Sequence, residues 1–288
     1  MNLLDELETR VVCGDGAMGT LLMAAGVPIE RCFEELCVSE PERIQKIHED
    51  YIAAGARVIK TNTFGANAVR LERFGMEKRV REINRAAVGL AKNAAKNKNV
   101  YVSGSVGPLG ISIEDAAAHG IDRAECFREQ IAELLNGGVD MILFETFTDL
   151  EEMEIALRAK NEVGNALEIC SFACASDGRL RCGTMLVDAF DRLRDLGAKI
   201  LGVNCLNDPR EMAALLRQIP AGYSLSVYPT AGQPRRDHSR FHYDVTPDFF
   251  AACARDLVTH GARLLGGCCG TTPAHVASLA NAIRNLSP

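Results

Sequence analysis

Three cysteines stand at the ends of two apolar segments, where their thiols could bind a metal ion. Cys205 ends LGVNC (201–205), and Cys268 and Cys269 stand together in LLGGCCGTTP (264–273). Thiolates favour zinc, and three protein ligands leave the fourth position of a tetrahedral ion open for a substrate, as in catalytic zinc sites. This pattern indicates a Zn²⁺ site at which a substrate sulfur could bind.

The same cysteines also have a purely structural interpretation, because free cysteine is among the residues most often buried in protein cores. The chain contains 11 cysteines. Cys170 and Cys174 alternate with apolar residues, while Cys126 and Cys253 stand in helical patterns. No CxxC pair, which is typical of compact structural zinc sites, occurs in the sequence. The spacing alone therefore leaves both a metal site and a cysteine-rich core open.

Glycines beside the cysteine pair supply the backbone freedom that a shared metal ion requires. Adjacent residues of a regular strand point to opposite faces of the sheet, so two neighbouring cysteines reach one ion only through irregular backbone. Gly266, Gly267 and Gly270 surround the pair, and glycine adopts irregular conformations at little energetic cost. We therefore expect a strand to end in a loop at Cys268.

Two carboxylates also follow apolar segments, in surroundings that are otherwise apolar or rich in glycine. Asp15 lies in GDGAMGT (14–20) and Glu145 in FETFTD (144–149). If both carboxylates face a shared cavity, a substrate ammonium group would satisfy them. The structural alternative is that Asp15 braces the first turn and that Glu145 pairs with a core lysine such as Lys60.

Three further residues are candidates for contact with a substrate. Gly16 and Ala17 follow Asp15, and glycine in this segment would let backbone N–H groups approach a ligand carboxylate closely. Asn204 precedes Cys205. Its side chain could orient the site or a bound amino acid, or it could simply make a hydrogen bond at the end of its strand.

These residues are expected to share one location because apolar segments alternate with helical segments along the chain. Eight strand–helix units predict an α/β fold, the (β/α)8 TIM barrel, in which every loop that follows a strand lies at one end. Active sites of such barrels lie at that end, so the carboxylates and the cysteines are expected to meet there. The predicted strands are 11–16, 57–63, 100–106, 140–146, 167–173, 198–204, 223–229 and 262–267.

Helical periodicity fills the segments between the predicted strands. In PERIQKIHEDYIAAG (41–55), Pro41 suits the first turn, apolar side chains recur on one face, and Gly55 can end the helix. The longest polar stretch without such a pattern is 230–245, which follows the seventh predicted strand. We expect this stretch to be irregular.

The length and composition are those of a globular enzyme, and the sequence has no excess of positive charge that would attract a polyanion. The chain has 288 residues, and we expect one domain (1–288), since a barrel of this kind fills about 250 residues. A net charge of −6 favours neither nucleic acid nor an anionic membrane surface as a partner. No signal peptide or membrane span is recognisable, and an odd number of cysteines favours a reducing cytoplasm over a disulfide framework.

Four motifs together resemble one protein family. GDGAMGT near the start, TNTF (61–64), GVNC (202–205) and GGCCGTTP (266–273) are similar to the pattern of homocysteine S-methyltransferases, and the resemblance extends from Val11 to Ile283. Within that family the chain is most similar to the homocysteine-binding module of cobalamin-dependent methionine synthases and of bacterial fusions with methylenetetrahydrofolate reductase. The resemblance implies a (β/α)8 barrel.

The resemblance also implies the chemistry of the site. It places zinc on Cys205, Cys268 and Cys269 and the amino group of homocysteine near Asp15 and Glu145. The expected reaction transfers a methyl group to the homocysteine sulfur and forms methionine. A free thiol is a poor nucleophile at neutral pH, because its pKa is about 8.5. Zinc would favour the thiolate of a bound substrate, and three cysteine thiolates would keep that sulfur electron-rich.

The methyl donor is expected to come from outside this sequence. The resemblance favours methylcobalamin on a separate protein or module. The expected partner is a corrinoid or folate-binding protein or module, for which we expect no room within this chain. The alternative donors are S-methylmethionine and betaine, whose enzymes share the cysteines. Those enzymes typically place aromatic residues, tryptophan included, near the cationic donor, whereas this chain has no tryptophan and 6% aromatic residues.

Two departures from the family pattern and two other functions stay open. Where methionine synthases usually read YPNAGLP, this chain has Thr230 and Gln233, so the preference for donor or substrate is unsettled there. The other functions are a zinc- and thiol-binding module without turnover and a structural partner barrel for a corrinoid protein. Asp15 and Glu145 favour catalysis, since neither a metal store nor a scaffold needs an ammonium site.

Overall fold

Eight parallel strands form the centre of the molecule, as the sequence predicts. The computed structural model describes residues 3–237, 240–284 and 286. Each strand overlaps one predicted segment: β1 Val12–Cys13, β2 Val58–Lys60, β3 Tyr101–Val106, β4 Met141–Phe147, β5 Leu167–Phe172, β6 Ile200–Asn204, β7 Leu225–Tyr228 and β10 Ala262–Leu265. Their order in the sheet, β1-β10-β7-β6-β5-β4-β3-β2, makes successive barrel strands neighbours.

Backbone contacts between β1 and β2 join the two ends of this sheet. Gly14 pairs with Val58 in a parallel bridge. The Asp15 N–H donates to the Val58 carbonyl at 2.9 Å, and the Arg57 N–H donates to the Cys13 carbonyl at 2.7 Å. The chain therefore forms the expected (β/α)8 TIM barrel, in which the C-terminal ends of the strands surround one opening.

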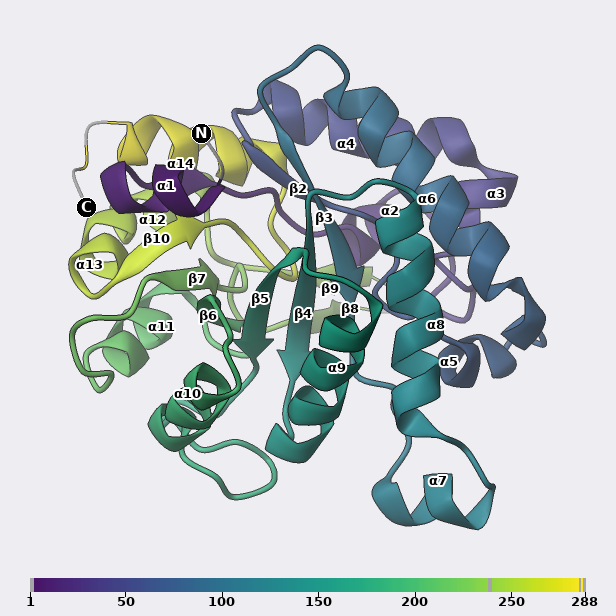
Figure 1. Cartoon of the computed structure of the whole chain (residues 1–288). Coiled ribbons are helices and arrows are strands. Elements are labelled where there is room, and N and C mark those ends of the chain that lie inside the picture. Colours follow the sequence, from purple (N-terminus) through teal and green to yellow (C-terminus); the bar gives the residue numbers. More distant parts are fainter. Residues whose placement is uncertain (1–2, 238–239, 285, 287–288) are drawn as a thin grey trace.

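Helices surround the barrel and connect its strands (Figure 1). They are α1 Leu3–Thr9, α2 Gly19–Ala24, α3 Leu36–Ser39, α4 Pro41–Ala53, α5 Ala68–Glu72, α6 Val80–Ala95, α7 Ile113–Ala118, α8 Arg123–Asn136, α9 Leu150–Val163, α10 Leu186–Asp195, α11 Pro209–Leu216, α12 Pro247–Ala252, α13 Ala254–Thr259 and α14 Pro273–Ile283. The short helix α7 projects away from the rest of the fold. Among the described residues, no helix has both the length and the apolar character needed to span a bilayer.

The helix α4 shows how the sequence sets the ends of these elements. It begins with Pro41, whose missing N–H is not needed in a first turn. Gly55 follows the helix with a φ of +107°, a left-handed conformation that glycine adopts readily and other residues rarely adopt. Tyr51 is buried on the inner face of the helix. The helix predicted over 41–55 is thus confirmed.

The segment 230–245 contains regular structure that the sequence does not predict. β8 (Arg235–Asp237) and β9 (Arg240–His242) pair as antiparallel strands. These strands lack the continuous apolar run by which the barrel strands are recognised, and their pairing depends on hydrogen bonds between the two strands. The expectation of an irregular segment is therefore wrong for these residues.

The interior of the barrel changes from apolar at the N-terminal ends of the strands to polar at the C-terminal ends. The apolar cluster includes Leu3 and Leu7 of α1, which covers the N-terminal end. Its other buried members are Val12, Val58, Met141, Leu143, Ile169, Ile200 and Leu264, together with Tyr228 at the C-terminal end of β7. The alternation of side chains along the strands then places polar residues inside the opposite end: Lys60, Ser105, Glu145, Ser171 and Asn204.

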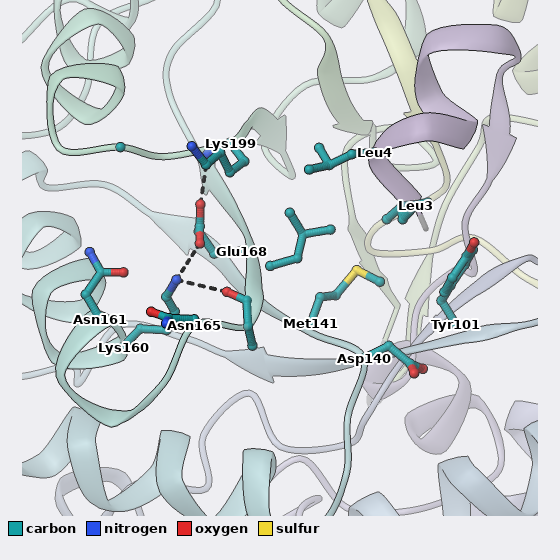
Figure 2. Close-up of a pocket in the computed structure, with 13 residues that line it drawn as sticks. Leu3, Leu4, Tyr101, Asp140, Met141, Lys160, Asn161, Asn165, Glu168 and Lys199 are labelled. Atoms are coloured by element: carbon teal, nitrogen blue, oxygen red, sulfur yellow. Dashed lines mark hydrogen bonds and ion pairs between the residues drawn. The ribbon is translucent and has the colours of Figure 1, made fainter. Parts of the chain in front are cut away.

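A hollow of about 590 Å³ lies beside α1 at the N-terminal end of the barrel (Figure 2). At its edge, Lys160 of α9 and Glu168 of β5 form an ion pair at 2.5 Å, with side chains 4% and 5% exposed. Glu168 also accepts a hydrogen bond from the Lys199 N–H at 2.8 Å, and Lys160 donates to the Ala166 carbonyl at 2.9 Å. The pair therefore links α9 to the starts of β5 and β6.

Removing one partner of this ion pair is expected to destabilise the protein strongly. Lys160→Met leaves the Glu168 carboxylate buried without its cation, which costs about 3–5 kcal/mol. Adding Glu168→Gln removes the charge but keeps an acceptor for the Lys199 N–H, so the double variant should recover roughly half of the loss or more. Urea unfolding measures both variants.

Lys46→Met is the matched control for this experiment, because Lys46 forms an exposed ion pair with Asp50. Its effect on the free energy of unfolding should be less than about 1 kcal/mol. Equal losses in the single and the double variant would contradict the view that the uncompensated charge of Glu168 causes the destabilisation.

Candidate functional site

A pocket of about 360 Å³ lies at the C-terminal opening of the barrel, where the sequence places the functional residues. The loops that follow β1, β2, β6 and β10 and the C-terminal part of β4 contribute to its wall. Seven of the predicted site residues line it: Asp15, Gly16, Ala17, Glu145, Cys205, Cys268 and Cys269. Asn204 stands behind this wall. The barrel therefore brings together residues that are far apart in the sequence.

The three cysteines converge although they come from two loops. Cys205 follows β6, whereas Cys268 and Cys269 follow β10. Their Sγ atoms lie within 4.8 Å of one another, with 3.9 Å between those of Cys205 and Cys269. Sulfurs bound to one tetrahedral zinc ion at about 2.3 Å are about 3.8 Å apart. The donor atoms and their spacing therefore fit a zinc ion with one position left for another ligand.

The last residue of β7 and the segment that follows it hold the backbones of these cysteines. The Cys205 N–H donates to the Tyr228 carbonyl at 2.9 Å, and the Cys268 N–H donates to the Pro229 carbonyl at 2.8 Å. The Cys269 carbonyl accepts a hydrogen bond from the Ala231 N–H, also at 2.8 Å. Because β7 lies between β6 and β10 in the sheet, it ties the two cysteine loops together.

Irregular backbone brings the adjacent cysteines to one point, as the surrounding glycines predict. Gly266 and Gly267 are packed so tightly that an added Cβ would lie 2.3 Å from the Tyr228 ring and 2.5 Å from the Thr271 hydroxyl oxygen, respectively. Cys205 has a φ of +62°, which a residue other than glycine adopts only where its surroundings impose it. Gly270, directly after the cysteine pair, has a φ of +78°, so both cysteine loops depart from regular strand geometry.

The three thiols strongly influence one another's protonation. The hydrogen bond to Cys268 is the main cause that raises the pKa of Cys205 far above its usual range. For Cys268, the hydrogen bond to Cys205 lowers the pKa, but Cys269 and burial raise it more. Hydrogen bonds from Cys205 and Cys268 lower the pKa of Cys269. Full deprotonation of the cluster therefore requires a compensating cation.

Both predicted carboxylates lie beside the ammonium group of Lys60. Its Nζ is 3.6 Å from Asp15 Oδ1, 3.5 Å from Glu145 Oε2 and 4.6 Å from the centre of the Tyr228 ring. Asp15 Oδ2 also accepts from the Lys60 N–H at 2.7 Å, and the Ser105 hydroxyl donates to Glu145. The lysine considered from the sequence as a structural partner of Glu145 thus pairs with both carboxylates.

Two polar atoms near Lys60 are buried without a hydrogen-bond partner among the described residues. They are Asp15 Oδ1 and the Tyr228 hydroxyl oxygen. Buried polar atoms are nearly always hydrogen-bonded, so an exception in the wall of a pocket, as for Asp15, indicates where a ligand group could bind. Burial raises the pKa of Asp15 to about 7, although Lys60 opposes the shift. An incoming cation would stabilise this carboxylate.

Asn204 supports the site from behind the pocket wall. Its Nδ2 donates to the Thr146 hydroxyl at 2.7 Å, and its Oδ1 accepts from the Thr146 N–H and the Ser171 hydroxyl, each at 2.9 Å. Thr146 has a φ of +63°, which is rare for a β-branched residue. Asn204 thus holds the strained residue that follows Glu145, and it directly precedes Cys205.

Gly16 and Ala17 form the part of the pocket wall next to Asp15. A Cβ added to Gly16 would lie 2.7 Å from the Tyr51 hydroxyl oxygen, so the packing requires glycine there. The Ala17 N–H donates to the Thr271 hydroxyl at 3.1 Å, and the Ala17 carbonyl accepts from Tyr51 at 2.6 Å. The Ala17 N–H therefore already has a protein partner.

The two residues that depart from the family pattern lie outside the lining of this pocket. Thr230 is buried, and its hydroxyl lies 3.3 Å from the Asn207 carbonyl oxygen and 3.1 Å from that of Gly232. Gln233 donates from Nε2 to the Leu206 carbonyl at 3.0 Å. Both side chains thus bind backbone groups of the surrounding loops.

Several supporting residues of the site are missed by sequence reasoning. Tyr51 lies on a helix face where an aromatic residue usually serves the core, and nothing local marks the conformation of Thr146. Thr271 belongs to GGCCGTTP, a motif that could have singled it out. Lys60, which the sequence suggests only as a structural partner of Glu145, ends an apolar segment as the two carboxylates do, and this position is the signal that could have placed it in the site.

Comparison with known proteins supports the sequence resemblance. The profile of the homocysteine S-methyltransferase family matches residues 12–283. The chain is 33% identical to methionine synthase of Mycobacterium tuberculosis over 305 aligned residues and 32% identical to that of Mycobacterium leprae over 307. Each alignment covers 99% of this chain but 26% and 25% of those proteins. The chain thus spans about a quarter of the length of these relatives.

Solved structures share the fold. The homocysteine methyltransferase MmuM from Escherichia coli, in its metallated form, is 28% identical and has a TM-score of 0.78, over 97% of this chain and 98% of that chain. Its oxidised form has a TM-score of 0.76, over 94% and 95% of the two chains. A methyltransferase from Methanosarcina mazei, at 14% identity and a TM-score of 0.59, is similar in fold alone.

The fold and the site define a (β/α)8 barrel protein with a cysteine cluster suited to a metal at its catalytic end. The profile match covers nearly the whole chain, and the chain therefore belongs to the homocysteine S-methyltransferase family. The resemblance indicated by the four sequence motifs is thus confirmed.

Asp15→Asn is expected to change how stability depends on pH. The pKa of an unfolded aspartate is about 3.9, whereas burial raises that of folded Asp15 to about 7. The folded wild type therefore binds an additional proton between these values, and the stability that this proton contributes is lost as the pH rises toward about 7. The free energy of unfolding of the wild type minus that of the variant should fall between about pH 5 and 7.

Urea unfolding of reduced, metal-free protein measures this difference, which should level off above about pH 8. Asp188→Asn, at an exposed aspartate of α10, is the control for loss of a surface carboxylate. A difference between wild type and Asp15→Asn that stays constant over this range would show that Asp15 titrates normally.

Proposed function

We propose that this chain is a zinc-dependent homocysteine S-methyltransferase and that residues 1–288 form one homocysteine-binding module. The observation that carries this proposal is a single pocket in which three thiols, within 4.8 Å of one another, accompany two buried carboxylates. Homocysteine has a thiol at one end and an amino acid group at the other. The pocket offers partners for both ends.

The cysteines would hold the metal at the pocket wall. Cys205, Cys268 and Cys269 supply three soft ligands and leave one tetrahedral position open. When bound, zinc would act as a Lewis acid that favours the thiolate form of homocysteine at the open position. The short distances between the Sγ atoms support this assignment, because deprotonated thiols repel one another unless a cation compensates their charge.

The other pocket residues would orient the amino acid. Asp15 and Glu145 would accept hydrogen bonds from its α-ammonium group, and Asp15 Oδ1, which lies 3.6 Å from Lys60 Nζ, has no hydrogen-bond partner among the described residues. Met18, Phe33 and Phe64 line the same pocket and would exclude water from the reacting sulfur. Holding the substrate at both ends would direct the sulfur toward the methyl donor, and such positioning contributes much of the rate of a transfer between two molecules.

The proposed donor is methylcobalamin on a corrinoid protein or module. Two relatives are methionine synthases, and this chain matches about a quarter of each, so other segments accompany the matching one there. The chain has no tryptophan, which makes the cation–π stabilisation of S-methylmethionine or betaine less favourable. The similarity to MmuM, a homocysteine methyltransferase, makes a direct comparison of donors the appropriate test.

Cys205→Ala is expected to abolish metal binding. Wild-type protein purified under reducing conditions should contain about one zinc per chain, and the variant less than about a tenth of that, because two thiolates bind zinc weakly. Cys182→Ala removes an exposed cysteine outside the site and should keep the wild-type zinc content. Elemental analysis measures the zinc, and urea unfolding verifies that both variants are folded.

Methyl transfer tests the reaction itself. Zinc-loaded wild type with homocysteine and methylcobalamin should form methionine, and Cys205→Ala should form none. Methionine from S-methylmethionine or betaine alone would reassign the donor but retain homocysteine as the acceptor. Binding of zinc and homocysteine without methionine from any donor would support a binding module without turnover. Fully reduced wild type that binds no zinc would overturn the proposed metal centre.

A further inference from the structure

Lys60 places a buried cation in the candidate pocket, and the reaction proposed above does not use it. Its side chain is 11% exposed and lines the pocket. No other lysine or arginine occurs among the described residues of this lining. Burial alone would lower the pKa of Lys60, but Glu145 and Asp15 raise it well above its ordinary value, so the group is charged at neutral pH.

The contacts of this ammonium group leave room for a further anionic partner. Its Nζ lies 3.5 Å from Glu145 and 3.6 Å from Asp15, whereas a direct hydrogen bond from an ammonium to a carboxylate is about 2.8 Å long. The ring of Tyr228 at 4.6 Å offers its face but no strong acceptor. An ammonium group has three N–H donors, so a ligand carboxylate could accept from Lys60 without breaking a short hydrogen bond.

The proposed substrate brings such a carboxylate. In an amino acid the carboxylate and the ammonium are attached to the same carbon, so a cation beside the ammonium site is close to both groups. The Ala17 N–H, one donor expected to approach this carboxylate, is already bound to Thr271. We propose that Lys60 binds the α-carboxylate of the substrate while Asp15 and Glu145 bind its ammonium group. This inference rests on the proposed function.

Lys60 would thereby act as a positioning residue that determines which thiols the pocket accepts. A thiol amine without a carboxylate has to compete with Lys60 for the same two carboxylates. An amino acid thiol supplies a new partner for Lys60 while its ammonium binds Asp15 and Glu145. Positive and negative groups then alternate, an arrangement that is strongly stabilising away from water. The site should therefore prefer a zwitterionic thiol to a thiol amine.

Lys60→Met tests this preference because it keeps the length of the side chain and removes its charge. Calorimetry on zinc-loaded proteins compares homocysteine with mercaptopropylamine, the same thiol without the carboxylate. The variant should bind homocysteine about 10- to 100-fold more weakly, the size of a charge-assisted hydrogen bond, and mercaptopropylamine at least as tightly as wild type does. Lys199→Met, at an exposed lysine beside the opposite end of the barrel, should alter neither affinity.

Three other outcomes would overturn the inference. Equal losses for both ligands would mean that Lys60 only maintains the structure of the site. Stronger binding of homocysteine by the variant would mean that Lys60 merely competes with the substrate ammonium. Wild-type protein that binds neither thiol would overturn the proposed function, and the role of Lys60 with it.

A second measurement does not depend on the folding of the variant, in which two buried carboxylates lose their cation. A crystal structure of the zinc-loaded wild type with homocysteine would locate the substrate carboxylate directly. A carboxylate oxygen within about 3 Å of Lys60 Nζ supports the inference. A carboxylate that is bound by backbone N–H groups alone overturns it.

Discussion

The charge gathered at one end of the barrel is the constraint on which the rest of the site depends. Three thiols, two buried carboxylates, the less buried carboxylate of Glu34 and an ammonium group surround one pocket. Buried charges are stable only where opposite charges or hydrogen bonds compensate them. Lys60 lies between the two buried carboxylates and compensates them within the chain. The deprotonated thiols need a cation as well.

Bringing these groups together requires strand ends that leave regular geometry. Thr146 and Cys205 both adopt positive φ values at the points where β4 and β6 end. Strained conformations of this kind persist where the surrounding contacts over-determine them. Asn204 supplies such contacts, because its amide binds both the backbone and the hydroxyl of Thr146. The Asn204 side chain thus couples the end of β4, which carries Glu145, to the end of β6, which precedes Cys205.

The barrel strands could be predicted because strands of a parallel sheet are continuous apolar runs, and the chain marks each run locally. The irregular backbone at the Cys268–Cys269 pair could be predicted because glycines flank the pair. The pairing of Lys60 with Glu145 is an alternative that the sequence suggests, but its position between two carboxylates could not be predicted, since the closed barrel decides which side chains face one another. The conformation of Thr146 depends on Asn204, which stands 58 positions away. The β8–β9 pairing likewise depends on a partner strand that no local pattern identifies.

The pocket lies across the place where the first and the last barrel strands meet. The Gly267 N–H donates to the Asp15 carbonyl at 2.8 Å, and the Ala17 N–H donates to Thr271, which is 254 positions further along the chain. During synthesis the N-terminal part emerges first, so Asp15 exists long before its partners do. A ligand that contacts both the loop after β1 and the loop after β10 would hold these two parts of the chain together. By mass action it would favour the completed barrel over every partly folded chain.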